Sequence, residues 1–373
     1  MLLLSQGDEE EARERAQFWL QHLRHKGVPE DSLHISFLQN AIERGAGALD
    51  VADPDDEKHI AFDHLLDLLG EAPDPAACYH LPHATGTSAG ELAPLPDLAD
   101  ALRLWQRVFP QEYPPMTIAE VTNHSAFSAP DDWLDMLDTH PVLWHSLEVL
   151  DDLVLALLYE FNQDDNLYDD YEALHQQLLD RAQALLELNL RFNRAEGKTL
   201  EWAFPGNRPA LRLIAQHIHG DALRPASDET LARIEWMLAL NPNDNHGMRE
   251  QAMETYLGRG QFDKALALSE RYPNDASIDM LFGTVLALFG TGQPEAAATE
   301  LAQANKFAPK VVPTLLAAKV KPPAHDAPAG FIAHGSDYQA WAYRMDYLRA
   351  WQRQPGALEW LRAQTASLRD ALI

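Results

Sequence analysis

The chain has 373 residues, 46% of them hydrophobic, which is enough apolar material to bury a sizeable core in about two domains. Asp and Glu number 57 against 29 Lys and Arg, and the net charge of −28 repels both nucleic-acid backbones and anionic lipid. We therefore expect no nucleic-acid partner and favour a protein or peptide, best a basic one, although an acidic composition also serves solubility alone. The single cysteine, Cys78, excludes an internal disulfide and a zinc site built from several cysteines.

The N-terminal stretch MLLLSQGDEEEARER has no basic segment before its leucines, so we expect no signal peptide. No part of the chain approaches the ~20 uninterrupted apolar residues that a membrane-spanning helix needs. We expect a cytoplasmic protein without a membrane segment.

Apolar residues at helical spacing predict helices from the beginning of the chain. The first two span Glu9 to Arg24 and Glu30 to Arg44, and the third spans Glu57 to Leu69. These helices make residues 1–70 an N-terminal helical region. Five prolines then interrupt any helical pattern, and they predict a proline-rich linker or long loop over residues 71–96: Pro73, Pro75, Pro82, Pro94 and Pro96.

Residues 97–195 form a second predicted helical region. Its helices span Leu98 to Phe109, about His140 to Phe161, and Tyr171 to Asn193. The helix ending at Phe161 is apolar on more than one face, so we expect it to lie centrally. No strand pattern of comparable strength occurs, and we predict an all-α fold.

The stretch from Ala276 to Pro309 predicts a pair of antiparallel helices. Apolar residues from Ile278 to Phe289 form one helical stripe, and Gly292 provides the turn. The second helix carries small residues where two helices approach closely, Ala297 and Ala304, and Pro309 ends it. Gly, Ala, Ala and Pro at this spacing are the pattern of a tetratricopeptide repeat (TPR).

A partial copy of the pattern precedes it. Gly260 lies 32 residues before Gly292 (292 − 260), Ala265 follows at the same spacing, and Pro273 ends the second helix early. At the C-terminus, tryptophans at helical spacing predict helices that cap the last repeat. We expect a TPR-like α-solenoid over residues 200–373.

Three further segments resemble a group of uncharacterised TPR-like proteins. They are LEWAFPGNRPALR from Leu200, LALNPNDNHGMR from Leu238, and the terminal segment that contains PGALEWLR. The resemblance covers about half the chain, from Leu200 onward, and it implies a helical-repeat fold rather than a reaction. His246 stands where that group carries glutamine.

The leading functional hypothesis is a scaffold or adaptor that holds a segment of another protein in a groove lined by the first helices of the repeats. We expect Gly283 in this lining, together with the candidate contacts: Arg208, Arg212, Asn243, Asn245, His246, Arg249, Glu250, Met253, Asp279 and Met280. Structural roles compete at several of these positions. Asn241 and Asn207 suit helix N-caps, and Arg208 and Arg212 suit internal salt bridges, which we favour over ligand binding.

The sequence contains none of the common metalloprotease, serine hydrolase, P-loop or dinucleotide motifs, so we expect no enzyme and no cofactor. A weak metal candidate is Cys78 with His80 and His83, for which coincidence is the favoured explanation. Two alternatives stay open: an N-terminal enzymatic or metal-binding module that the repeats position, and a structural protein that associates with itself.

Overall fold

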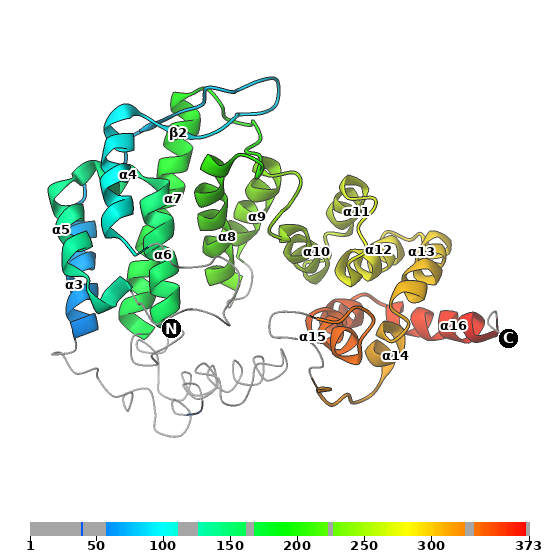
Figure 1. The fold of residues 1–373 in the computed structure, drawn as a ribbon. Helices are drawn as coiled ribbons and strands as arrows, with labels where there is room; N and C mark the ends of the chain where they lie inside the picture. Colours follow the sequence, from blue (N-terminus) through cyan, green and yellow to red (C-terminus); the bar gives the residue numbers. More distant parts are fainter. Residues whose placement is uncertain are drawn as a thin grey trace. The chain divides into compact units, whose positions relative to one another are not determined.

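A computed structural model describes residue 39 and residues 57–110, 126–161, 168–222, 227–324 and 332–370. Over these ranges the protein is helical, with two strands of two residues each (Figure 1). The predicted all-α class is confirmed for this part of the chain. Two helices predicted near the N-terminus, Glu9 to Arg24 and Glu30 to Arg44, lie outside the described residues except for Gln39.

The described residues form two compact units, which join between His246 and Gly247. From the sequence we expected the repeats to begin near residue 200, whereas the helices from there to His246 belong to the first unit. The elements of the first unit are α3 (Glu57–Glu71), β1 (Tyr79–His80), β2 (Ala93–Pro94), α4 (Pro96–Val108), a short 3-10 turn (Ala126–Ser128), α5 (Asp131–Thr139), a second 3-10 turn (Pro141–His145), α6 (Leu147–Phe161), α7 (Tyr168–Phe192), α8 (Arg208–Ala222) and α9 (Asp228–Leu240).

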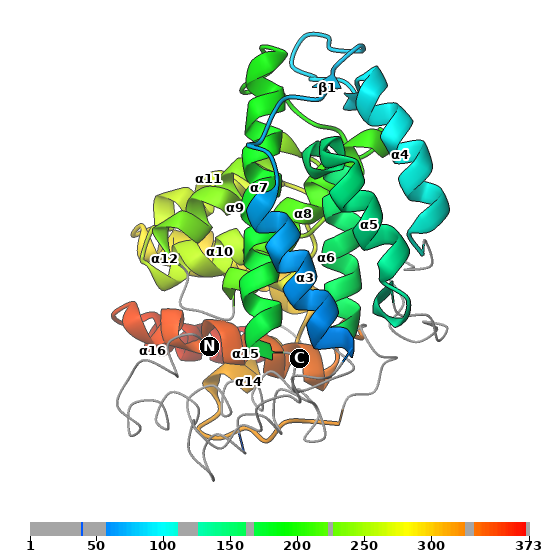
Figure 2. The same ribbon diagram turned by 90° about the vertical axis from the view of Figure 1, so that its left-hand side faces the viewer.

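Aromatic side chains fill one part of the first unit's core, where α3, α4 and α5 meet. The indole rings of Trp105 and Trp133 are fully buried and lie edge to face, with 6.4 Å between their centroids. Phe109 stacks on Trp105, and Phe127 joins Phe62 of α3 to Trp133. Figure 2 shows α3 and α5 side by side in this unit. Such ring contacts add to the hydrophobic stabilisation from burial.

Residues 71–96 form a long loop that is packed against the first unit. Its two short strands pair in antiparallel fashion, and the Tyr79 side chain is completely buried. The backbone N–H of Tyr79 donates to Asn189 Oδ1 of α7 at 2.8 Å, and Nδ2 of Asn193, the residue after the end of α7, donates to the Tyr79 carbonyl at 3.0 Å. The prolines prevent a helix here, while these contacts fix the loop on α7.

The second unit contains helix pairs. Its elements are α10 (Met248–Gly258), α11 (Phe262–Arg271), α12 (Ile278–Gly290), α13 (Pro294–Phe307), α14 (Val311–Leu316), α15 (Asp337–Arg353) and α16 (Ala357–Asp370). The predicted turn glycines Gly260 and Gly292 have φ of 68° and 77°, which side-chain-bearing residues rarely adopt. Ala297 and Ala304 are completely buried, as expected for the contact between two helices of a pair.

Helix α15 packs against four other helices of this unit: α10, α12, α14 and α16. Tyr343 of α15 contacts Phe282 of α12, with 5.5 Å between ring centroids, and Arg353 Nη1 donates to the Gly258 carbonyl of α10 at 2.9 Å. The α10–α12 face of the second unit is therefore covered by the chain's own α15.

Of the helices that the structure describes, none combines the length and apolarity that crossing a membrane requires.

Candidate functional site

The groove expected on the first helices of the repeats is not open. Met253 and Met280 are buried, with 0% and 3% of their surface exposed. Met253 of α10 packs closely on α12, since a Cβ added to Gly283 would come within 2.7 Å of its sulfur. The expectation that these methionines line a binding groove is wrong, because both side chains are buried.

The other candidates in this unit also contact the chain itself. Arg249 forms an ion pair with Asp275 and lies over the Tyr272 ring, 5.7 Å from its centroid. The backbone carbonyl of Glu250 accepts from the Tyr347 hydroxyl of α15 at 3.4 Å. Burial, and after it the neighbouring Glu250, raise the pKa of Asp279 to about 7. Glu250 and Asp279 therefore lie beside α15, whereas Arg249 contacts Asp275 and Tyr272.

The two arginines of the NRP segment are bound within the first unit. Arg208 Nε donates to the Trp202 carbonyl at 3.1 Å, and its guanidinium lies over the Trp202 ring. Arg212 forms an ion pair with Asp151 of α6, to which its Nε donates at 3.0 Å. The side chain of Asp151 is only 4% exposed. The internal salt bridge that we favoured for Arg212 is present.

The expectation that the Asn207 side chain caps the following helix is wrong, because its oxygen accepts from a backbone N–H of a distant loop. Its Oδ1 accepts from the Leu92 backbone N–H at 2.9 Å, and its Nδ2 donates to the carbonyls of Gly90 and Glu201 at 2.9 and 3.1 Å. The side chain is completely buried. The Asn207 side chain therefore binds the loop of residues 71–96 to the beginning of α8. The spacing of residues around Asn207 in the sequence does not predict this contact.

The NPNDN segment is a turn rather than a helix start. Asn241 is the C-cap of α9, Asp244 adopts a left-handed φ of 48°, and α10 begins only after Gly247. The expectation that Asn241 caps a following helix is wrong because two successive turns separate it from Met248. The side chains of Asn243 and Asn245 are exposed in this turn.

The structure brings two of the resembling segments together. The Leu200 N–H donates to the Leu240 carbonyl at 2.6 Å, and the Trp202 and His246 rings meet edge to face at 4.8 Å. Burial lowers the pKa of His246. Trp202 thus contacts the Arg208 guanidinium with its face and His246 edge to face, so these three residues pack against one another.

The metal candidate is not assembled. His80 and His83 are exposed, and burial raises the pKa of the half-buried Cys78 thiol. Throughout the described ranges, no three His, Cys, Asp or Glu side chains gather closely enough to hold a metal ion.

Buried carboxyl groups cluster on one turn of α6. Burial raises the pKa of Glu148, of Asp151 to about 6, and of Asp152 to about 7. Each carboxyl group has a partner in the chain: Tyr79 for Glu148, Arg212 for Asp151, and the Trp105 indole N–H for Asp152 at 2.8 Å. Shifted pKa values often mark active sites. Here, however, each of the three carboxyl groups binds a residue that packs beside α6.

These shifts predict a pH dependence of stability. Because the folded-state pKa of Asp152 is raised to about 7, the native state holds a proton that the unfolded chain releases near pH 4. The contribution of this Asp152 proton to the free energy of unfolding is fully present below pH 4 and is lost as pH rises through 7. We expect Asp152→Asn, which keeps an acceptor for Trp105, to raise the free energy of unfolding by roughly 2 kcal/mol at pH 8. Urea denaturation should show no such gain at pH 4, and equal gains at both pH values would contradict the assignment.

The first unit does contain an open groove, between α7 and α9. It has a volume of about 440 Å³, within the range of ligand sites. Residues of α7, of the turn after it, and of α9 line the groove: Gln183, Glu187, Leu190, Arg191, Glu196, Gly197, Glu229, Ala232, Arg233 and Trp236. We call it the α7–α9 groove.

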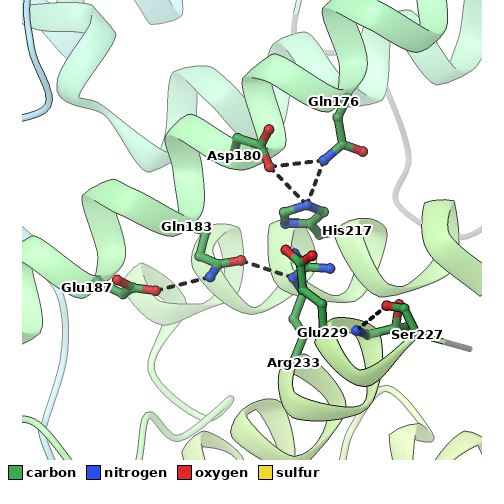
Figure 3. Close-up of polar contacts among 9 residues, drawn as sticks. Gln176, Asp180, Gln183, Glu187, His217, Ser227, Glu229 and Arg233 are labelled. Carbon is green, nitrogen blue, oxygen red and sulfur yellow. Dashed lines mark hydrogen bonds and ion pairs between the residues drawn. The ribbon is translucent and has the colours of Figure 1, made fainter.

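Arg233 anchors a polar network in this groove (Figure 3). Its Nε donates to Gln183 Oε1 of α7 at 3.0 Å, and its Nη2 donates to Glu229 Oε1 at 3.1 Å. Gln183 Nε2 in turn donates to Glu187 at 3.0 Å. The Arg233 side chain is 6% exposed and that of Glu229 is 80% exposed, so the arginine is held in place while the carboxylate reaches solvent.

A separate polar cluster lies further along α7, where His217 Nε2 of α8 is 2.8 Å from Gln176 Nε2 and 3.2 Å from Asp180 Oδ1 (Figure 3). The groove itself combines three carboxylates, two guanidinium groups and the half-buried indole of Trp236. An indole face beside carboxylates is suited to a cationic side chain.

None of these lining residues was predicted from the sequence. The signal was available, because Glu229, Arg233 and Trp236 repeat at helical spacing along α9, as do Gln183, Glu187 and Leu190 along α7. Helical spacing does not indicate that these two stripes face one another.

Comparison of the chain with protein-family models, with curated proteins and with solved structures finds no match in any of the three.

Proposed function

We propose that this protein is an interaction module that binds a segment of another protein in the α7–α9 groove. The observation that carries the proposal is an open groove whose lining contains Trp236 together with Glu187, Glu196 and Glu229. We take the occupant to be a peptide segment with a basic side chain, which fits the net charge of −28. In this proposal, the bound segment lies in the α7–α9 groove of the first unit, and the TPR-like helix pairs of the second unit act as a scaffold.

The charges in the groove favour a basic occupant. The Arg233 guanidinium is held by Gln183 and Glu229, so it adds little attraction for an anion. Glu187, Glu196 and Glu229 contribute three carboxylates, and Arg191 is the other cation of the lining. A lysine or arginine side chain that enters the groove gains attraction from these carboxylates and an aromatic surface from Trp236.

The proposal is tested with peptides selected on the full chain from a random library displayed on phage. We expect the selected peptides to be enriched in Lys and Arg. Trp236→Ala should weaken their binding, measured by fluorescence anisotropy, at least tenfold, because a tryptophan at the centre of an interface commonly contributes about 2 kcal/mol or more.

Phe307→Ala is the matched control, since it removes an aromatic side chain that is 52% exposed in the second unit. Its affinity for the same peptides should equal that of the unmodified chain. Peptides that bind Trp236→Ala with undiminished affinity, or that are enriched in acidic residues, would contradict the proposal.

A further inference from the structure

Three polar side chains of the first unit meet where α7 packs on α8. His217 Nε2 of α8 lies 2.8 Å from Gln176 Nε2 and 3.2 Å from Asp180 Oδ1, and Gln176 Nε2 lies 3.0 Å from the same Asp180 oxygen. The three atoms form a nearly equilateral triangle, and Figure 3 shows the three side chains pointing toward one another. We call Gln176, Asp180 and His217 the α7–α8 triangle.

The spacing of these atoms matches one face of a metal ion's coordination shell. An octahedral divalent ion with bonds of about 2.1 Å keeps neighbouring ligand atoms about 3.0 Å apart. Imidazole nitrogens and carboxylate oxygens are common ligands of first-row metal ions. The third corner also becomes a ligand after a half-turn of the Gln176 amide, which exchanges its nitrogen for its oxygen.

The two helices fix the corners of the triangle. Gln176 and Asp180 are four residues apart on α7, a spacing that places them on the same face of a helix, and α8 packs against α7 and brings His217 to them. The side chain of His217 is 2% exposed and that of Asp180 is 61% exposed. The triangle therefore has one corner held in the core and another that reaches water, so a bound ion can keep water ligands.

The groups beside the triangle on α7 do not oppose a cation. Burial, together with His217, lowers the pKa of His175 to about 4, so this imidazole is uncharged at neutral pH. The guanidinium of Arg181 is used elsewhere, since it donates to the carbonyls of Trp144 and Pro73 at 2.7 and 2.6 Å. The Asp180 carboxylate supplies the negative charge that a divalent ion requires.

We propose that the α7–α8 triangle binds a divalent first-row metal ion, with His217 Nε2, Asp180 Oδ1 and the Gln176 amide oxygen as three ligands of an octahedral shell that water completes. Two oxygen ligands and one nitrogen suit Mn²⁺, which serves as the probe. One ligand is an amide, so the site differs from a cluster of His, Cys, Asp and Glu alone, which the described residues lack. The proposal does not depend on peptide binding in the α7–α9 groove.

Manganese binding to the full chain tests the proposal, with free Mn²⁺ measured by electron paramagnetic resonance. We expect one ion per chain. Asp180→Ala and His217→Ala should each weaken binding at least tenfold, since the loss of even an indirect partner of a metal ligand commonly costs about 10–100-fold. Because Asp180 is exposed, its replacement tests the site even if the buried His217 proves necessary for folding.

Asp67→Ala is the matched control, because it removes an exposed carboxylate from a helix of the same unit, α3. This variant should bind Mn²⁺ as the unmodified chain does.

Gln176→Glu separates a metal site from a cluster that is only hydrogen-bonded. A second carboxylate beside Asp180 adds a charged ligand and should tighten Mn²⁺ binding about tenfold, whereas in a cluster without metal it only introduces repulsion between like charges. The proposal is overturned if Mn²⁺ binds only at millimolar concentration, if Asp67→Ala weakens binding as much as Asp180→Ala does, or if Gln176→Glu binds no more tightly than the unmodified chain.

Discussion

Replacing Arg212 with methionine should lower the free energy of unfolding by about 3–5 kcal/mol at pH 8, because it leaves the buried Asp151 carboxylate without its partner. Asp151 is 4% exposed; its two carboxylate oxygens share the Arg212 Nε–H at 3.1 and 3.0 Å, and Arg212 Nη2 donates to Oδ2. Urea denaturation followed by circular dichroism measures the change. The loss should be smaller at pH 5, where Asp151 can take up a proton.

Two further variants separate this explanation from a general loss of packing. Arg212→Met combined with Asp151→Asn should recover most of the stability, because no charge is then buried. Arg103→Met removes an arginine that is 62% exposed and paired with Asp100 on the surface of α4, and it should change stability by less than about 0.5 kcal/mol. A double variant as unstable as Arg212→Met alone would show that the ion pair is not the cause.

Replacing Asn207 with alanine should lower the free energy of unfolding by about 2–4 kcal/mol, because a buried N–H and two buried carbonyls lose their partner. The same change should increase hydrogen exchange at Leu92, whose N–H donates to Asn207. Denaturation and exchange together distinguish local release of the loop from global destabilisation.

Asn243→Ala is the control for this prediction, because Asn243 is exposed in the turn after α9. The substitution should cost less than about 0.5 kcal/mol. If Asn207→Ala proved equally mild, the loop of residues 71–96 would be held by its other contacts, such as those of Tyr79 with Asn189 and Asn193.

Features set by neighbouring residues were predictable from the sequence. The helix pair Ile278–Gly290 and Pro294–Phe307 follows from an apolar stripe, a glycine that tolerates positive φ, and a proline in the first helical turn. Burial of Ala297 and Ala304 follows from the same pattern. The fold class was therefore accessible because each helix is specified by residues within it.

Contacts between distant segments were not predictable in this way. Asn207 and Leu92 are 115 residues apart, and nothing in the spacing around Asn207 indicates which backbone it will bind. Gln183 and Arg233 are 50 residues apart, so the α7–α9 groove depends on how α7 and α9 flank α8. The tryptophans of α15 predicted a buried face, yet periodicity does not tell which helices that face will cover.

The occupancy of the α7–α9 groove is measured most directly by photocrosslinking. A benzophenone side chain placed at the exposed Ala232 of the groove is irradiated with a selected basic peptide, and the same side chain at Glu270 of α11 serves as the reference position. We expect the peptide to be attached covalently at position 232, to be displaced by unlabelled peptide, and not to be attached at position 270. Equal attachment at both positions, or attachment at position 270 alone, would contradict the groove as the binding site.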